Sequence, residues 1–342
     1  MGKVVAAVGL SHAPGALAFP ETADPKVRQR TEDATRSLGI SLESSQPDVI
    51  IAFLDDHFEN FFRNLCPSII MGIADQHVGP ADQWMETLRI DKKTIFPGAP
   101  ALAEKLLASL TEQGFDIARA GPCEYGNNLL MPWKLMGVEH SLANVPIIPV
   151  FINVFTPPLI SYQRAYTLGE AVRHGVETAF PAETKVAFMC TGGLSHWPPY
   201  WNPVQGGDPP TDSFLQRIKR YQTEGKSYLK QDPRLFVDFD DYEIEMAKKN
   251  EYPLNSKHPL VNWDWDRAFM AKYSDGDSEY MKKLTYEEVE EEAGHGGHEV
   301  LNWVAMLGAM KGAKSKMLLY EPVVEWICGM VYQDFCVTEK LN

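Results

Sequence analysis

Residues 3–15 read KVVAAVGLSHAPG, and this stretch predicts how the fold begins. The apolar run Lys3–Leu10 has the length and valine content of a buried strand, and the polar residues Ser11 and His12 follow it directly. Similar runs, each bounded by Gly, Pro, Asp or Asn, follow at residues 48–54, 68–74, 145–154 and 185–190. We therefore expect these runs to form a central sheet.

Helical patterns separate the strand-like runs. They are clearest at Ala101–Gln113, where Leu102, Leu106 and Leu110 share one face, and at Tyr162–Val176. Alternating strands and helices favour a three-layer α/β/α domain with a mostly parallel or mixed central sheet and its active site at the carboxyl ends of the strands. The C-terminal part is expected to contain an amphipathic helix at Glu299–Lys311 and closing strands at residues 317–320 and 323–332.

The pattern changes near Pro198. From about residue 212 to 292 the chain is charged and helical in pieces, and it lacks strong strand signals. We interpret residues 1–342 as a single catalytic domain with an insertion or lid at about 200–258. Trp197 and its aromatic neighbours would then cover a pocket, although ordinary packing of the added segment explains them equally well.

The composition is that of a soluble globular protein, with 342 residues, 44% of them hydrophobic and 23% charged. The net charge of −14 argues against nucleic-acid binding, which needs a basic surface. No apolar run reaches the roughly 18 residues of a membrane span. The 5 cysteines are widely spaced, with no CxxC pair, and indicate reduced thiols and a cytoplasmic location.

Three histidines follow three of the predicted strands. His12 follows the first run, His57 follows residues 48–54, and His196 follows residues 185–190. Because the carboxyl ends of parallel strands meet at one edge of a sheet, we expect the three side chains to converge on one site. Each alone would be an ordinary loop histidine, but the three together favour a site.

The loop AGHGGHE at residues 293–299 adds a fourth element. It places His295, His298 and Glu299 before a predicted helix, and its glycines let the backbone approach a ligand closely. Spacing alone does not choose a metal ligand among these three residues, and a simple capping loop is the alternative. Imidazoles with a carboxylate suit a divalent metal, either the iron of a non-haem oxygenase or the zinc of a hydrolase.

Other polar residues carry weaker signals. Asp55 and Asp56 are candidates to orient His57 by hydrogen bonding. The histidines without a partner pattern, expected at the surface, are His77, His140, His174 and His258. The sequence has no phosphate-binding glycine loop, GxSxG motif or dinucleotide fingerprint, which argues against kinases, α/β-hydrolases and dinucleotide-dependent enzymes.

As a set, these motifs resemble the class III extradiol dioxygenases, the family that contains the catalytic β subunit of protocatechuate 4,5-dioxygenase. The resemblance covers most of residues 1–200 and 259–332. The matching motifs, in family order, are SHAPG (11–15), DDH (55–57), NVFTPP (153–158), LGEAVR (168–173), TGGLSH (191–196) and the helix EVLNWVAMLGA that starts at Glu299.

The resemblance implies Fe(II) held by His12, His57 and Glu299, with His196 as the acid/base beside the substrate. It implies ring cleavage of a catecholic or o-aminophenolic aromatic, with both atoms of O₂ incorporated. His295, at the rim of the pocket with His298, would then be a substrate-pocket candidate. Relatives of this kind are commonly oligomeric, so we expect a homo-oligomer, with or without a small α-type partner subunit.

One departure from the family concerns Tyr125. The family commonly has another active-site histidine in a DHG motif, where this chain reads Glu124-Tyr125-Gly126. We expect the Tyr125 hydroxyl to point into the pocket as a hydrogen-bond donor, from a turn that Gly126 and Asn127 favour. The alternative is a tyrosine packed at the sheet edge.

Two other functions stay open at this point, a zinc-dependent hydrolase at the same site and a non-enzymatic binding protein of the same fold. Metal analysis and O₂ uptake with catechols would separate the enzymes, and retention of all three ligands and His196 argues against a binding protein. No basic cluster lies near the motifs to receive a substrate carboxylate, and Glu321 and Glu325 add negative charge.

Overall fold

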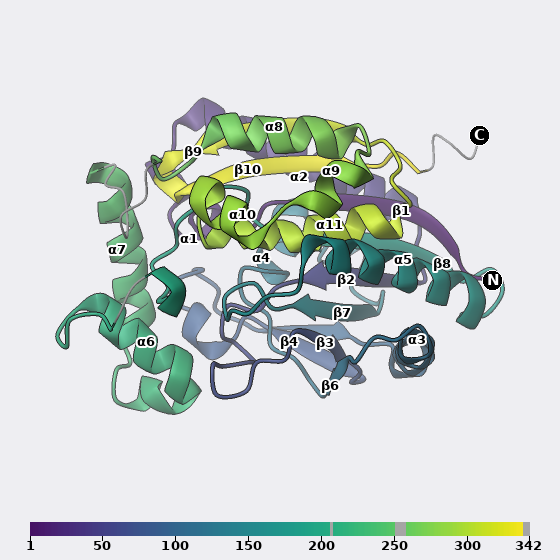
Figure 1. Cartoon of the computed structure of the whole chain (residues 1–342), viewed down its shortest axis with the longest axis horizontal. Coiled ribbons are helices and arrows are strands. Elements are labelled where there is room, and N and C mark those ends of the chain that lie inside the picture. Colours follow the sequence, from purple (N-terminus) through teal and green to yellow (C-terminus); the bar gives the residue numbers. More distant parts are fainter. Residues whose placement is uncertain (206–207, 250–257, 338–342) are drawn as a thin grey trace.

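A mixed sheet of eight strands forms the centre of the molecule, in the order β6-β3-β7-β2-β8-β1-β10-β9 (Figure 1). The computed structural model describes residues 1–205, 208–249 and 258–337. The strands are β1 (Lys3–Leu10), β2 (Val49–Leu54), β3 (Ile69–Gly72), β4 (Gln76–Gly79), β5 (Thr94–Pro97), β6 (Ala118–Ala120), β7 (Ile147–Ile152), β8 (Lys185–Thr191), β9 (Lys316–Val323) and β10 (Cys328–Asp334). Strands β4 and β5 pair separately as a two-stranded ribbon.

Helices surround this sheet, and together the two kinds of element confirm the expected three-layer α/β/α class. The described α-helices are α1 (Gly15–Ala18), α2 (Pro25–Ser44), α3 (Pro100–Glu112), α4 (Leu130–Met136), α5 (Tyr162–Ala179), α6 (Phe214–Glu224), α7 (Leu235–Lys249), α8 (Trp263–Ser274), α9 (Ser278–Lys283), α10 (Tyr286–Ala293) and α11 (Val300–Ala309).

The parallel centre of the sheet decides where the site lies. Strand β8 lies between β2 and β1, and it pairs in parallel with both. The carboxyl ends of these three strands therefore meet at one edge, as the sequence predicted. Strand β7 continues the parallel set beside β2, whereas β3 and β10 run antiparallel to their inner neighbours.

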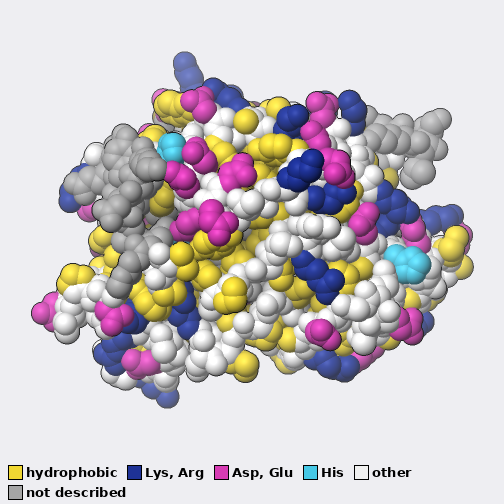
Figure 2. Space-filling view, viewed as in Figure 1, with side chains coloured by type: hydrophobic (Ala, Val, Ile, Leu, Met, Phe, Trp, Pro, Cys, Tyr) yellow, Lys and Arg dark blue, Asp and Glu magenta, His cyan; other side chains and the backbone are white. Residues whose placement is uncertain are grey.

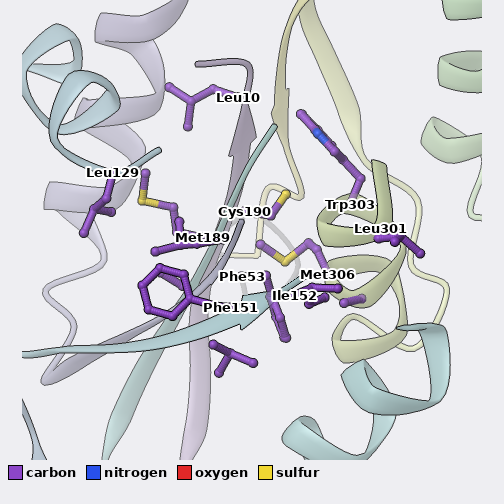
Figure 3. Packing of buried hydrophobic residues seen from close by; sticks show 14 of the residues in the cluster. Leu10, Phe53, Leu129, Phe151, Ile152, Met189, Cys190, Leu301, Trp303 and Met306 are labelled. Carbon is purple, nitrogen blue, oxygen red and sulfur yellow. The ribbon is translucent and has the colours of Figure 1, made fainter. Parts of the chain in front are cut away.

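The two faces of the sheet are covered by different helices. Helix α11 packs on β8, β2 and α5, while α2 packs on β1, β9, β10 and α4. Figure 3 shows side chains of α11, among them Trp303 and Met306, on one side of the strands and Leu129 on the other. All residues of α11 are buried, so the prediction of an amphipathic helix was wrong: α5 covers the side of α11 that faces away from the sheet.

The described part of the segment 200–258 is helical, as expected. Its helices α6 and α7 lie at one side of the molecule, at the left of Figure 1. Helix α7 contacts the short 3₁₀ helix η7 (Val324–Trp326), which connects β9 to β10. The segment thus reaches the same edge of the sheet as the strand ends that carry the histidines.

The surface mixes charges of both signs. On the face shown in Figure 2, Asp and Glu side chains are interspersed with Lys and Arg, and hydrophobic side chains show between them. None of the helices in the described residues combines the length and apolarity that crossing a membrane requires.

Candidate active site

The loops after β1, β2 and β8 bring His12, His57 and His196 together around Glu299. Glu299 ends a 3₁₀ turn, η6 (Gly296–Glu299), and directly precedes α11. Its Oε2 lies 3.1 Å from His12 Nε2, and its Oε1 lies 3.4 Å from His57 Nε2 and 3.2 Å from His196 Nε2. All four side chains are buried. The convergence expected from the strand ends is therefore present, and Glu299 is the residue of its loop that takes part.

Four of the buried side chains have the arrangement of a metal site. His12, Asp55, His57 and Glu299 each offer one ligand atom, and these atoms lie within 4.8 Å of one another. His12 Nδ1 and Nε2, His57 Nδ1 and Asp55 Oδ2 are buried without a hydrogen-bond partner in the described structure. Buried polar atoms are rarely left unpaired, so a bound cation fits this donor set.

The charges around these ligands also favour a cation. Burial and the charge of Glu299 raise the pKa of Asp55 well above its usual value. Burial alone would raise the pKa of Glu299 too, but the imidazoles of His12 and His196 outweigh it and hold that pKa well below its ordinary range. Two carboxylates in one dry cluster repel each other unless a cation lies between them.

The carboxylates are held by residues from other elements. Asn302 of α11 donates from Nδ2 to Asp55 Oδ1 at 2.7 Å and to the carbonyl oxygen of Thr191 at 2.9 Å. The backbone N–H of Gly193 donates to Glu299 Oε2. Helix α11 and the loop after β8 therefore fix both carboxylates before any metal binds.

Glu59 is a site residue that the sequence did not reveal. Its Oε2 accepts a 2.7 Å hydrogen bond from the backbone N–H of His57, and its Oε1 accepts a 2.9 Å bond from Trp84 Nε1. The expectation that Asp56 orients His57 was wrong, because Asp56 instead accepts hydrogen bonds from the backbone of Asn60 and Phe61. Asp55 does face His57, with Oδ2 3.3 Å from Nδ1.

His196 differs from the two histidines of the metal group in having both ring nitrogens engaged. Nδ1 lies 2.8 Å from the carbonyl oxygen of Leu194, and Nε2 faces Glu299. Burial acts to lower the pKa of His196, but the charge of Glu299 and these hydrogen bonds together raise it above its usual value. An imidazole exchanges its proton readily, so His196 is suited to take up and return one.

A cavity opens beside this cluster, with about 380 Å³ of space between its atoms when the open solvent at its mouth is included. The residues that line it are His12, Ala13, Pro14, His57, Trp84, Asn127, Gly193, His196, Pro198, Tyr200, Phe239, Glu243, Glu299, Trp326, Ile327 and Cys328. Aromatic rings and aliphatic groups thus face the imidazoles and Glu299 across the cavity.

Tyr125 does not line this cavity, contrary to the expectation that its hydroxyl points into the pocket. Its ring is buried against Phe96, His77 and Phe151, and its hydroxyl has no hydrogen-bond partner in the described structure. The predicted turn is present, but the prediction for Tyr125 was wrong. Asn127 is the member of this turn that lines the cavity.

The prediction that His77 lies at the surface was also wrong. It is 1% exposed, and its Nδ1 accepts a 3.1 Å hydrogen bond from the backbone N–H of Cys123. Burial lowers its pKa to about 4. A histidine kept neutral in this way serves as a packed polar residue under the Tyr125 turn.

The remaining pocket candidates have other surroundings. His295 Nε2 is 2.6 Å from the carbonyl oxygen of Pro198, and the ring of Trp197 packs against Gly294. His298 lies between Tyr162 and Glu290, with Nδ1 2.9 Å from the tyrosine oxygen and Nε2 3.0 Å from the carboxylate. None of these three residues is among those that line the cavity described above.

The fold and the site define a metal-dependent enzyme with a buried aromatic cavity at the strand ends of an α/β sheet. The family described as the catalytic LigB subunit of aromatic ring-opening dioxygenase matches residues 6–331. The chain belongs to this family, and its class is that of the extradiol ring-cleavage dioxygenases.

The similarity to known proteins extends over almost the whole chain. A 2,3-dihydroxyphenylpropionate/2,3-dihydroxicinnamic acid 1,2-dioxygenase of Photorhabdus laumondii is 29% identical over 325 residues, covering 94% of this chain and 93% of that protein. An enzyme of the same name from Rhodococcus globerulus is 28% identical, covering 94% of each chain. Among solved structures, an uncharacterized protein from Escherichia coli K12 has a TM-score of 0.48 and 14% identity, covering 96% of this chain and 99% of that one.

Proposed function

We propose that this protein is an Fe(II)-dependent extradiol dioxygenase that opens the ring of a catecholic or o-aminophenolic compound. The observation that carries the proposal is the convergence of His12, His57 and Glu299 on one buried point, with His196 beside it and an aromatic cavity in front. The names of the relatives, which refer to aromatic diols, support a catecholic substrate.

In this proposal His12, His57 and Glu299 hold the iron. The Nε2 atoms of both histidines face Glu299, whereas Asp55 Oδ2 lies 3.3 Å from His57 Nδ1 and 3.8 Å from His12 Nε2. A carboxylate behind a ligand histidine fixes the ring and increases its basicity, so we assign that role to Asp55. When bound, the metal would supply a shared binding point for the substrate oxygens and O₂.

The other residues of the cavity handle the substrate. His196 takes the proton of a ring hydroxyl as the substrate binds and returns a proton later, because it borders the cavity and the ligands at once. Tyr200, Phe239 and Trp326 present aromatic surfaces that receive a flat ring and exclude water.

The proposed location is the cytoplasm, and the proposed assembly is a homo-oligomer. The thiols of Cys66, Cys123, Cys190 and Cys328 are free, which suits a reducing compartment. The assembly, with or without a small α-type partner subunit, rests on the family resemblance.

Removal of a ligand tests the metal site. His12→Ala and Glu299→Ala should each lose most of the bound iron after anaerobic loading, because the site loses one of three protein donors. His140→Ala, which changes an exposed histidine, is the matched control and should keep its iron. Metal analysis reads the result, and a His12→Ala protein with full iron content and full activity would rule out the site.

Oxygen uptake tests the reaction itself. The iron-loaded protein should consume O₂ with at least one member of a panel of catechols, gallates and aminophenols, and a yellow ring-opened product should form. Tight zinc binding with ester or amide hydrolysis, and no O₂ uptake with any diol, would instead establish a zinc-dependent hydrolase.

A further inference from the structure

Glu243 is a buried carboxyl group in the wall of the cavity that the reaction scheme does not use. It lies on α7, is 3% exposed, and lines the cavity together with Phe239, one helical turn earlier. Within the described residues, no Lys, Arg or His forms an ion pair with it. An unpartnered carboxyl group that is nine-tenths buried and faces a cavity points to a polar group on the ligand.

The surroundings of Glu243 are unsuited to a second negative charge. Among the described residues that line the cavity, none is Lys or Arg. Burial and the neighbouring charge of Asp240 raise the pKa of Glu243 well above its usual value. If a protonated Glu243 donated a hydrogen bond to a substrate carboxylate, the pair would still hold one buried negative charge with no cation beside it. Such a charge is costly to bury.

The relatives contrast with this arrangement. Their printed names refer to dihydroxyphenylpropionate and dihydroxicinnamic acid, so their substrates carry a carboxylate on the ring substituent. Recognition of a carboxylate usually employs Arg, Lys or several N–H donors. The part of this cavity that α7 contributes offers an acceptor instead.

We propose that Glu243 determines substrate specificity, selecting an aromatic diol whose ring substituent ends in a protonated amine or another hydrogen-bond donor, and disfavouring a carboxylate at that place. This inference rests on the proposed function and deepens it, since it names the substituent while the ring-opening site fixes the diol. The remaining wall residues near η7, Trp326 and Ile327, give the substituent an apolar path toward Glu243.

Three diols of matched size test the preference in the iron-loaded enzyme. They are 3-(2-aminoethyl)catechol, 3-(2,3-dihydroxyphenyl)propionate and the uncharged 3-ethylcatechol, with catechol as the reference. The wild type should favour the amine over the propionate roughly tenfold or more in kcat/KM, the order expected of one charge-assisted contact. Glu243→Gln should remove most of that difference by raising the KM of the amine.

Glu245→Gln is the control variant. Glu245 lies on the same helix, is exposed, and pairs with Lys248 rather than facing the cavity. Its substrate preference should equal that of the wild type. The comparison of the three diols in the wild-type enzyme requires no variant. The proposal can therefore still be tested if Glu243→Gln folds poorly.

A second readout needs no iron. 2-Phenylethylamine and 3-phenylpropionate lack the diol, and calorimetry on the protein without added metal should show tighter binding of the amine. Failure to cleave any diol, catechol included, would overturn the proposed function. Cleavage of catechol with the propionate preferred, or an unchanged preference in Glu243→Gln, would overturn the role of Glu243 alone.

Discussion

His196 and His12 lie at similar distances from Glu299 but differ in what else they contact. Both ring nitrogens of His196 have hydrogen-bond partners, whereas among the described residues neither nitrogen of His12 has one, because the 3.1 Å approach of His12 Nε2 to Glu299 lacks hydrogen-bond geometry. A buried nitrogen without a partner is available to bind a metal, whereas one that is already hydrogen-bonded is less so. This difference supports His196 as the acid/base and His12 as a metal ligand.

His196→Ala should therefore keep its iron and lose turnover. We expect a fall of about 10²- to 10⁴-fold in kcat, the usual contribution of a general acid/base. Iron content and single-turnover kinetics measure the two effects separately. If His196→Ala lost its metal while Glu299→Ala kept it, the two roles would have to be exchanged.

Tyr125→Phe should leave both activity and iron content unchanged. The Tyr125 hydroxyl is buried without a partner in the described structure and lies outside the cavity lining, so its removal deletes no contact with the substrate. Asn127→Ala, from the same turn, should lower kcat/KM because Asn127 does line the cavity. Steady-state rates of the two variants decide the matter, and a tenfold loss in Tyr125→Phe would restore the tyrosine as a hydrogen-bond donor.

Some of these residues could be predicted from sequence and others could not, for a physical reason. His12 and His57 each follow a strand directly, so the parallel sheet alone predicts that they meet. The surroundings of Glu59 and Glu243 come from distant parts of the chain: Glu59 bonds to Trp84, and Glu243 faces a cavity built from several segments. Their burial, and hence their importance, appears only in the folded chain.

At the level of elements, the contact between α5 and α11 holds Glu299 in place. The two helices approach so closely that a Cβ added at Gly169 would lie 1.8 Å from the carbonyl oxygen of Ala305. At Gly308 an added Cβ would lie 2.0 Å from the carbonyl oxygen of Tyr166. Glycine on both helices therefore sets the position of α11, and with it the carboxylate at the start of that helix.

Gly169→Ala should destabilise the protein by about 3 kcal/mol, because backbone atoms cannot yield as a flexible side chain can. The better helix propensity of alanine, worth about 1 kcal/mol, offsets only part of this cost. Gly121→Ala is the control, since a Cβ there meets nothing within 4 Å. Denaturant unfolding compares the two variants, and equal stabilities would show that the helices can move apart freely.

Elements with a strong local pattern were predicted closely. The expected strand Lys3–Leu10 has those same bounds in the structure, and the helix predicted at Ala101–Gln113 spans Pro100–Glu112. Strands β4, β5 and β6 were not predicted, because they have only three or four residues each and form through pairing with distant segments. Pairing of that kind leaves no periodic signal in the local sequence.

Across the whole molecule, Asp266 of α8 connects the loop after β8 to the edge strand β9. Its Oδ1 accepts a 2.8 Å hydrogen bond from the backbone N–H of Ser195, and its Oδ2 accepts a 2.7 Å bond from the Tyr320 hydroxyl. Burial raises the pKa of Asp266 to about 7, although these hydrogen bonds act to lower it. The folded protein therefore holds a proton on Asp266 that the unfolded chain releases near pH 4.

This proton makes stability depend on pH in a stated direction. The contribution of Asp266 is fully present below about pH 4 and is lost as the pH rises through about 7, by up to about 1.4 kcal/mol per pH unit. Asp266→Asn does not titrate and keeps an oxygen to accept from Ser195. Relative to this variant, the wild type should lose stability between pH 4 and 7 in chemical denaturation, and parallel curves would contradict the assignment.

The site is assembled from both ends of the polypeptide. His12 follows β1, Glu299 precedes α11, and the Ser11 hydroxyl exchanges hydrogen bonds with the backbone of β10 at Gly329 and Val331. A ribosome that has made only the first 200 residues has produced all three histidines but not the carboxylate at their centre. We therefore expect the metal to be acquired late, only after residue 299 has been made and Glu299 has folded against the histidines.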